Sequence, residues 1–175
     1  MTITIRPAVT GDAATLSTIG EATFIETFGP DGFAIPYPAA ELAAWLPEAY
    51  GAAKFAGRIA SADHGVWIAE DAAGHAIGYA TAGPCGLPHP EAGDGGELYQ
   101  LYVTRAGQGT GTGARLFDIA TGWLEAQGHR QLWLGVWSGN LKAQAFYRRR
   151  GFDKVGDYLF PVGAWRDEEY IFRRG

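Results

Sequence analysis

Hydrophobic and polar positions change their spacing along this chain, and the spacing predicts strands that alternate with helices. Ile3 and Ile5 alternate with polar residues, as in a strand. From Asp12, which is typical of a helix N-cap, apolar residues recur at helical spacing as far as Phe28. The same patterns predict further strands at 66–70, 75–80, 97–103, 131–137, 152–160 and 166–172. They predict further helices at 38–50, 114–127 and 140–150.

The order of these elements, β-α-α-β-β-β-α-β-α-β-β, is typical of a mixed α/β sheet. Residues 71–74 form a turn-like segment between two strands, which predicts a hairpin. Residues 83–96 contain three prolines and five glycines, so we expect a mobile loop there. No internal repeat, low-complexity tract or linker divides the chain. Its 175 residues are enough for one core, and we expect a single domain over 1–175.

Composition and charge exclude several classes of protein. Hydrophobic residues make up 47% of the chain, which excludes a disordered protein. The net charge of −5 argues against nucleic-acid binding. No apolar run approaches the ~18 residues of a membrane span, and the N-terminus lacks the apolar core of a signal peptide, so we expect no membrane association. The lone Cys85 cannot form an internal disulfide, and we expect a cytoplasmic protein without a metal site.

The segment Gln108-Gly109-Thr110-Gly111-Thr112-Gly113 lies between a predicted strand and a predicted helix. Glycines there leave backbone N–H groups accessible at a helix N-terminus, where the helix dipole favours a phosphate or pyrophosphate. A Walker A motif is excluded because Ala114 and Arg115 follow the loop, where Lys and Ser or Thr are needed. A dinucleotide-binding fingerprint is excluded because no acidic residue closes the next strand. A sharp glycine turn without a ligand remains the alternative.

A second motif follows the predicted strand at 131–137. It reads Asn-x-x-Ala-x-x-Phe-Tyr-x-x-x-Gly-Phe over residues 140–152, and the glycine segment before it reads Gln-x-x-Gly-x-Gly. In this order and spacing, the two motifs resemble those of the Gcn5-related N-acetyltransferase (GNAT) family. The resemblance implies a mixed, mostly antiparallel, twisted sheet with splayed central strands, flanked by about four helices. It also implies an enzyme that transfers an acetyl group from acetyl-CoA to a primary amine by direct attack in a ternary complex, with CoA as product.

The resemblance places the cofactor on the two motifs and on the strand before them. The strand backbone is expected to pair with the pantetheine arm, and the glycine-loop amides to hold the pyrophosphate. The motif asparagine is expected to contact the cofactor and to cap its helix. The expected cofactor-binding residues are Leu101, Tyr102, Val103, Gln108, Gly109, Thr110, Gly111, Thr112, Gly113, Ala114 and Asn140.

Acetyl transfer needs a neutral amine, a stabilised oxyanion and a proton for the departing thiolate. By resemblance, Tyr147 of the second motif donates that proton; the alternative is a ring that only packs on the sheet. Glu97 lies eleven residues before Gln108, the offset of the base in the histone-acetylating branch. A solvent-facing glutamate or a water chain are the alternatives to that role. Some bacterial ribosomal-protein N-acetyltransferases place a base glutamate where this chain has Gly135.

The C-terminal motif region and the stretch Glu26-Thr27-Phe28 resemble the bacterial spermidine/spermine N-acetyltransferase branch. This resemblance implies a small cationic amine, such as a polyamine, as acceptor. Phe24, Glu26 and Phe28 are the expected substrate-binding residues, through carboxylate and cation–π contacts. A protein or peptide N-acetyltransferase and a non-catalytic acyl-CoA sensor remain alternatives. Homodimers are common in the family, but the sequence identifies no interface.

Overall fold

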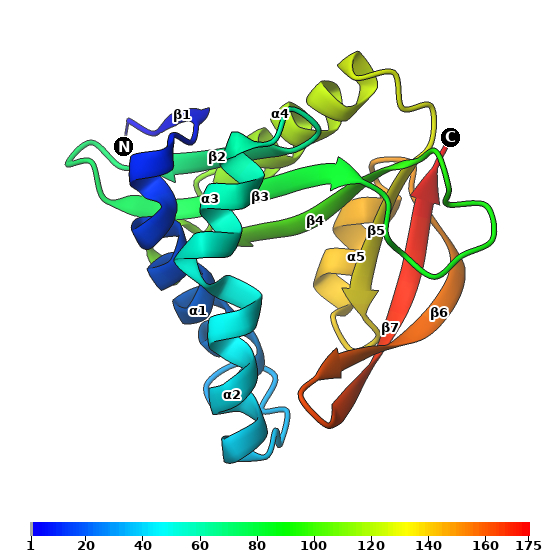
Figure 1. The fold of residues 1–175 in the computed structure, drawn as a ribbon, viewed down its shortest axis with the longest axis horizontal. Coiled ribbons are helices and arrows are strands. Elements are labelled where there is room, and N and C mark those ends of the chain that lie inside the picture. The colour runs from blue at the N-terminus through cyan, green and yellow to red at the C-terminus, as the bar shows by residue number, and fades with distance from the viewer. Residues whose placement is uncertain (1) are drawn as a thin grey trace.

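The computed structural model of the protein describes residues 2–175, so Met1 of the predicted domain lies outside it. Seven strands form one sheet in the order β1-β2-β3-β4-β5-β7-β6 (Figure 1). The strands are β1 (Thr4–Pro7), β2 (Gly65–Glu70), β3 (Ala76–Pro84), β4 (Gly96–Val103), β5 (Leu132–Trp137), β6 (Asp153–Val162) and β7 (Trp165–Arg174). The helices are α1 (Ala13–Phe28), α2 (Ala39–Tyr50), α3 (Ala52–Ala60), α4 (Thr112–Ala126) and α5 (Leu141–Arg148), with short 3-10 turns η1 (Thr10–Asp12) and η2 (Arg105–Gly107). Within this sheet only β4 and β5 pair in parallel, so the predicted mixed, mostly antiparallel fold is confirmed.

Helices cover both faces of the sheet. On one face, α1 and α3 pack against β2 and β3, with Leu16, Phe55 and Tyr79 buried between them. On the other face, Leu116 and Phe117 of α4 are buried in one cluster with Leu98 of β4, and residues of α5 pack on the same cluster. Figure 1 shows α1 and α3 in front of the strands and α4 behind them. The sheet is therefore the middle layer of the molecule, with one core on each side.

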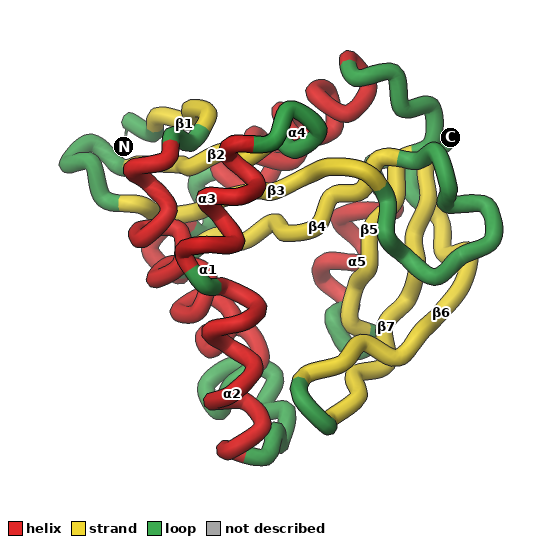
Figure 2. The backbone as a smooth tube through the Cα atoms, in the orientation of Figure 1, coloured by secondary structure: helices red, strands yellow, loops and turns green. Residues whose placement is uncertain are grey.

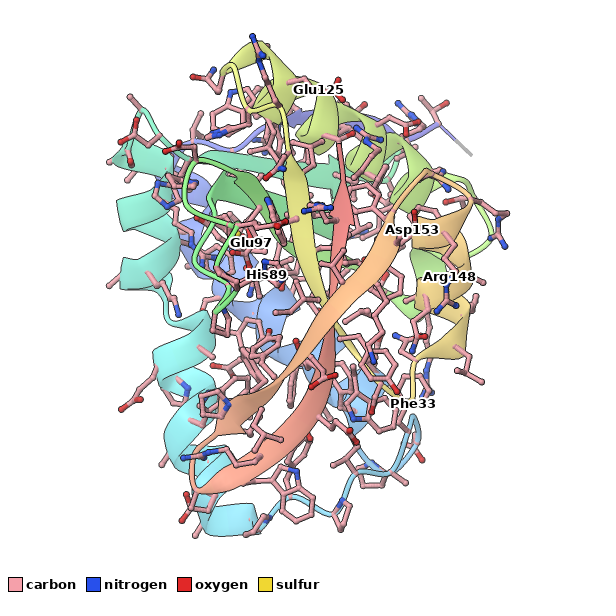
Figure 3. The ribbon with its side chains drawn as sticks, turned by 90° about the vertical axis from the view of Figure 1, so that its right-hand side faces the viewer. Phe33, His89, Glu97, Glu125, Arg148 and Asp153 are labelled. Atoms are coloured by element: carbon pink, nitrogen blue, oxygen red, sulfur yellow. The ribbon has the colours of Figure 1, made fainter. Side chains whose placement is uncertain are left out.

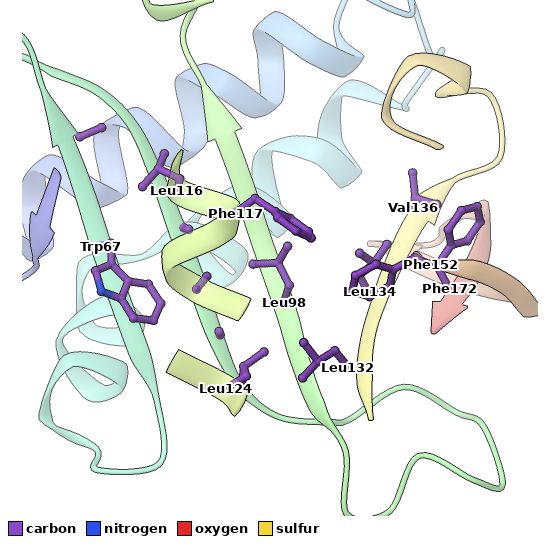
Figure 4. Close-up of a cluster of buried hydrophobic side chains, with 14 of the residues drawn as sticks. Trp67, Leu98, Leu116, Phe117, Leu124, Leu132, Leu134, Val136, Phe152 and Phe172 are labelled. Carbon is purple, nitrogen blue, oxygen red and sulfur yellow. The ribbon is translucent and has the colours of Figure 1, made fainter. Parts of the chain in front are cut away.

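The sheet opens between its two central strands. β4 and β5 pair only at Gly96–Leu132 and Glu97–Trp133. Beyond these pairs, β5 stays with β7 and β4 stays with β3, so the two strands diverge (Figure 4). Backbone groups on the two facing edges are left without a ladder partner, which makes them available to another extended molecule.

A β-bulge in β4 lies beside this opening. Thr81 pairs with Gln100 and Ala82 pairs with Leu98, so Tyr99 has no partner on β3. A bulge bends the strand and changes the direction of its side chains. Here it brings the side chains of Tyr99 and Gln100 to helix α3.

Helix α3 is absent from the predicted elements. Gly51 resembles the end of the preceding helix, and residues 52–60 contain too few large apolar residues to reveal a helical period. In the structure Gly51 has φ −56° and ψ 142°, and it only turns the chain from α2 into α3. Phe55 then anchors α3 in the core, with its ring centroid 5.8 Å from that of Tyr79.

The loop between β3 and β4 lies against the sheet instead of extending into solvent (Figure 2). The Cys85 N–H donates to the Gly95 carbonyl at 2.9 Å and closes the loop at its base. Leu87 and Ala92 are buried in a cluster with Trp133 of β5. Turn hydrogen bonds and buried apolar residues thus hold a segment that its composition alone predicts to be mobile.

Candidate active site

The glycine segment forms the turn from β4 into α4. Gly109 and Gly111 have φ of +76° and +81°, values that residues with a side chain rarely adopt. Gly111 is the N-cap of α4, which begins at Thr112, before the predicted start at Ala114. Within the described residues, no acceptor takes the backbone N–H groups of residues 109–114. These donors and the positive end of the helix dipole have the geometry of an anion site.

A cavity of about 310 Å³ opens between this loop, β4, β5 and α5, and we call it the motif cavity. Asn140 lies on its wall and also caps α5, because its Oδ1 accepts the Ala143 N–H at 3.0 Å. The predicted cofactor residues on the wall are Leu101, Tyr102, Val103, Gln108, Gly113 and Asn140. The other predicted cofactor-binding residues belong to the turn and to the first turn of α4, and they do not line the cavity. They are Gly109, Thr110, Gly111, Thr112 and Ala114.

Tyr147 both packs on the core and lines the motif cavity, so it fits both interpretations that the sequence left open. Its ring centroid lies 6.0 Å from that of Phe117 and 6.4 Å from that of Phe152, so the ring packs on the core. The residue also lines the motif cavity. Burial raises the pKa of its phenol to about 12. The group is therefore protonated at neutral pH and able to donate a proton or a hydrogen bond.

A second cavity, of about 390 Å³, lies between α1, α2, α3 and the strands β4, β6 and β7. We call it the aromatic cavity, because its wall includes Phe24, Phe28, Trp45, Tyr50, Tyr99, Tyr102, Tyr158 and Phe160. The two cavities share Phe28, Tyr102, Gly135 and Glu169 as lining residues. Tyr102 belongs to β4 and Gly135 to β5, so the cavities meet where these strands diverge. A molecule in one cavity can therefore touch a molecule in the other.

Glu97 belongs to the last β4–β5 pair and lines the aromatic cavity but not the motif cavity. Its Oε2 accepts the Gly86 N–H at 2.8 Å, and Figure 3 shows it beside the loop that contains Gly86. Burial raises the pKa of its carboxyl group, while hydrogen bonds from Gly86 and Cys85 and the charge of Arg58 oppose that rise. The predicted base is thus a half-buried member of the site, held in place by the loop.

Two cations from α3 also line the aromatic cavity, Lys54 and Arg58. The Arg58 guanidinium donates to Gln100 Oε1 at 3.0 Å and lies 4.8 Å from the centre of the Tyr99 ring. Burial lowers the pKa of Arg58, yet arginine remains charged at neutral pH. Among residues 2–175, no carboxylate lies within salt-bridge distance of either cation. The sequence prediction misses both because it misses α3.

Glu169 of β7 is the carboxylate at the junction, since it lines both cavities. The Tyr158 hydroxyl donates to its Oε2 at 2.6 Å. Burial raises the pKa of Glu169 to about 7; the hydrogen bond from Tyr158 opposes this rise, and the charges of Asp167 and Glu97 add to it. A carboxyl group that titrates near neutrality can accept and release a proton under physiological conditions.

The sequence conceals Glu169 because the C-terminal strand has apolar residues on both faces. Tyr170 and Phe172 pack on the side of α4 and α5, whereas Ile171 is buried under the loop between β3 and β4. Asp167 and Glu169 share the parity of Ile171, so both acids lie on a covered face. That parity is the signal that could have revealed them.

The three residues predicted to bind substrate separate in the structure. Phe24 and Phe28, with ring centroids 5.0 Å apart, line the aromatic cavity. Glu26 lines neither cavity, and its Oε2 accepts the Arg105 N–H at 3.2 Å in the turn after β4. Residues four apart share a helix face, whereas a residue midway between them points away. The structure thus brings the two rings, but not the carboxylate, to the site.

The environment of Cys85 does not favour cysteine chemistry. Burial raises the pKa of the Cys85 thiol to about 12, which disfavours the thiolate that a nucleophile needs. In residues 2–175, no group of three or more His, Cys, Asp or Glu side chains gathers in a metal-binding arrangement. No helix in this range is both long and apolar enough to cross a membrane.

Comparisons with known proteins define the class. Residues 31–152, more than half of the chain, match the family model described as the acetyltransferase (GNAT) family. An uncharacterised N-acetyltransferase of Lactobacillus delbrueckii subsp. lactis is 26% identical over 157 residues, which cover 89% of this chain and 87% of that protein. The chain therefore belongs to the GNAT family, and the prediction of an acetyl-CoA-dependent acyltransferase is confirmed.

Solved structures agree in fold. The PaiA N-acetyltransferase from Thermoplasma acidophilum, in complex with coenzyme A, has a TM-score of 0.76 at 20% identity, with 99% of both chains covered. A phosphinothricin acetyltransferase from Sinorhizobium meliloti, in complex with acetyl-CoA, has a TM-score of 0.67 at 23% identity, with 99% of this chain and 88% of that chain covered. At these identities the likeness establishes the fold alone. The comparisons do not assign this chain to the spermidine/spermine branch.

Proposed function

We propose that this enzyme transfers the acetyl group of acetyl-CoA to the primary amine of a small acceptor, by direct attack in a ternary complex. One observation carries the proposal: two cavities that share four lining residues meet where β4 and β5 diverge. In this assignment the motif cavity receives acetyl-CoA and the aromatic cavity receives the amine. The reacting atoms then meet between Tyr102 and Gly135.

The motif cavity offers the groups that a CoA thioester requires. The N–H groups of residues 109–114 would bind the pyrophosphate at the N-terminus of α4. The open edge of β4 at 101–103 would pair with the pantetheine arm as an added strand, and Asn140 would contact the cofactor from α5. Tyr147, whose phenol is protonated at neutral pH, would give its proton to the departing thiolate.

The charges of the aromatic cavity bear on the choice of acceptor. The wall has two cations, Lys54 and Arg58, and four acids, Glu48, Glu97, Asp167 and Glu169. A polyamine carries several ammonium groups, and the two cations would repel those that reach α3. Glu97 and Glu169 lie at the end of the cavity where the strands diverge. We therefore propose an acceptor with one primary amine, which faces these carboxylates, and one anionic group such as a carboxylate, which faces Arg58.

Arg58 suits an anion because its guanidinium presents several N–H donors, and Gln100 and Thr81 occupy only Nη1. The aromatic walls would enclose the apolar part of the same acceptor. A structural relative carries the name phosphinothricin acetyltransferase, so this fold serves acceptors other than polyamines.

The test is release of CoA from acetyl-CoA by the purified protein, followed with a thiol reagent. The acceptor panel contains amino acids and other amino-carboxylates, spermine, spermidine and putrescine, and short peptides with free N-termini or lysines. We expect turnover with a small amino-carboxylate and little with the polyamines. Each amino-carboxylate is paired with its amide, which keeps the amine and removes the anion.

Other outcomes would replace the proposal. Faster turnover of polyamines, or equal turnover of an acid and its amide, would refute the anionic acceptor. Faster turnover of peptides would support a peptide N-acetyltransferase. Tight binding of acetyl-CoA without turnover of any acceptor would support a non-catalytic acyl-CoA sensor.

A further inference from the structure

The place where the two cavities meet has one carboxylate. Phe28, Tyr102, Gly135 and Glu169 are the residues that line both cavities, and among them only Tyr102 and Glu169 titrate. Burial raises the pKa of Tyr102 well above its ordinary value, so it cannot serve as a base near neutrality. Glu169 is therefore the group at the junction that can take a proton from an amine.

Gly135 makes room for this carboxylate. A Cβ at Gly135 would lie 2.6 Å from the Tyr158 hydroxyl oxygen and 2.7 Å from Glu169 Oε2. Both distances are shorter than any ordinary contact of a Cβ atom, so a side chain on β5 at this position would require the Tyr158 hydroxyl and the Glu169 carboxylate to shift. The carboxylate thus reaches from β7 into the space that a side chain at residue 135 would occupy.

Tyr158 positions Glu169. Its hydroxyl donates to Glu169 Oε2 at 2.6 Å across the β6–β7 pair, which leaves Oε1 for another partner. Among residues 2–175, no lysine or arginine forms a salt bridge with Glu169. The titratable groups that face it are Tyr37, Tyr50 of α2, Glu97 and Tyr102 of β4, Tyr147 of α5, Tyr158 of β6 and Asp167 of β7.

We propose, on the basis of the acetyltransferase function above, that Glu169 is the general base and that Tyr158 is its positioning residue. Glu169 removes a proton from the acceptor ammonium, and the neutral amine attacks the thioester carbonyl. The new C–N bond forms and the C–S bond breaks. Tyr147 gives a proton to the thiolate and recovers one from the nitrogen of the tetrahedral intermediate. The net products are the amide, CoA and the proton on Glu169, which passes to solvent.

Glu97 is less suited to this step. It does not line the motif cavity, and its carboxyl group accepts hydrogen bonds from Gly86, Cys85 and Leu87. Its negative charge contributes to the rise in the pKa of Glu169 and would attract the acceptor ammonium. In this proposal Glu97 binds the acceptor, whereas the sequence predicts it as the base.

The experiment compares Glu169→Gln with Glu168→Gln in CoA release, over pH 5 to 9, with the best acceptor of the panel. Glu168→Gln is the matched control, because it makes the same chemical change at the neighbouring, exposed position of β7. We expect Glu169→Gln to lower kcat/KM about 100-fold or more and to leave the affinity for acetyl-CoA within about threefold. Glu168→Gln should match the wild type.

The pH profile separates a base from a structural residue. Wild-type kcat/KM should rise with pH through about 7, as Glu169 loses its proton, and Glu169→Gln should lose this rise. The hydrogen bond from Tyr158 stabilises the carboxylate form of Glu169. Because Tyr158→Phe removes this bond, the rise in kcat/KM should move to higher pH. Glu97→Gln should weaken acceptor binding but keep the rise.

Two failures are distinguishable. If the wild type turns over an amine and Glu169→Gln keeps its rate and its pH profile, Glu169 is not the base, while the acetyltransferase function stands. If the wild type binds acetyl-CoA and acetylates no amine, the proposed function fails and the assignment of Glu169 fails with it.

Discussion

The motif cavity and the aromatic cavity meet at one opening, but they are built from different parts of the chain. Residues 101–147 supply nearly the whole wall of the motif cavity, and the glycine turn beside it leaves its backbone N–H groups without an acceptor among the described residues. The aromatic cavity takes side chains from α1, α2, α3, β4, β6 and β7, which are far apart in sequence. A backbone site depends on glycines at fixed spacing, whereas a side-chain site depends on which residues the packing brings together.

This difference has a consequence for specificity. In the proposed assignment, the motif cavity would suit any acyl-CoA, because it would bind a pyrophosphate and an extended arm. The aromatic cavity would select the acceptor by charge and shape, through Arg58, Glu97, Glu169 and its rings. Changes in the first cavity should therefore alter cofactor binding or the chemical step, and changes in the second should alter which acceptor reacts.

The largest effect is expected for Tyr147, the side chain of the motif cavity that we propose as the proton donor to the thiolate. Tyr147→Phe removes the phenol proton and keeps the ring that packs on Phe117. We expect kcat to fall about 100-fold or more, with acetyl-CoA affinity changed less than about threefold. Steady-state kinetics and calorimetric binding check this. A variant with more than half of the wild-type kcat would leave Tyr147 only a packing role.

The next effect is a change in stability with pH at the junction. The folded-state pKa of Glu169 is about 7, above its ordinary value of 4.5. The folded protein therefore holds a proton that the unfolded chain loses, and the free energy of unfolding should fall as pH rises from about 4.5 to 7. The wild type should lose about 2 to 3 kcal/mol of unfolding free energy over this range, and Glu169→Gln should not show this loss.

Urea unfolding of the wild type and Glu169→Gln at pH 5 and pH 8 checks this sign. The free energy of unfolding of the variant, relative to that of the wild type, should be higher at pH 8 than at pH 5. Glu168→Gln, on the exposed side of the same strand, should show no such difference. Equal changes at both pH values would mean that Glu169 has an ordinary pKa.

A smaller effect should distinguish acceptor binding in the aromatic cavity from cofactor binding in the motif cavity. Arg58→Gln keeps a donor for Gln100 but removes the charge. We expect KM for an amino-carboxylate to rise about 10-fold or more, while kcat and acetyl-CoA affinity stay within about threefold. The amide of the same acceptor should be unaffected. Arg149→Gln, at the exposed C-cap of α5, is the matched control.

The smallest effect concerns the glycine turn. A Cβ at Gly111 meets no atom within 4 Å, so Gly111→Ala tests only its φ of +81°. We expect a loss of about 1 to 2 kcal/mol in stability and a weaker affinity for acetyl-CoA. Gly122→Ala is the control, because it adds the same methyl group to the middle of α4, with no atom within 4 Å and no positive φ. That change should stabilise the protein, and thermal unfolding measures both.

The sequence predicted the parts of the fold with strong local signals. The hydrophobic periods located all seven strands and four of the five α-helices of the described chain. α3 was not predicted, because Gly51 resembles a helix end and because Phe55 is the one large apolar residue that α3 buries. The loop between β3 and β4 was located, but not its packing on Trp133, because that contact joins distant segments.

The sequence by itself determined the family, the cofactor-side motifs and Tyr147, because these depend on residues close together in the chain and on glycines that the backbone requires. Only the tertiary structure decided the acceptor side. It placed Arg58 beside Gln100, left Glu26 outside the site, and brought Glu169 and Tyr158 into the space above Gly135. Such contacts depend on strand parity, on a bulge and on the divergence of β4 and β5, and no local pattern encodes where those features meet.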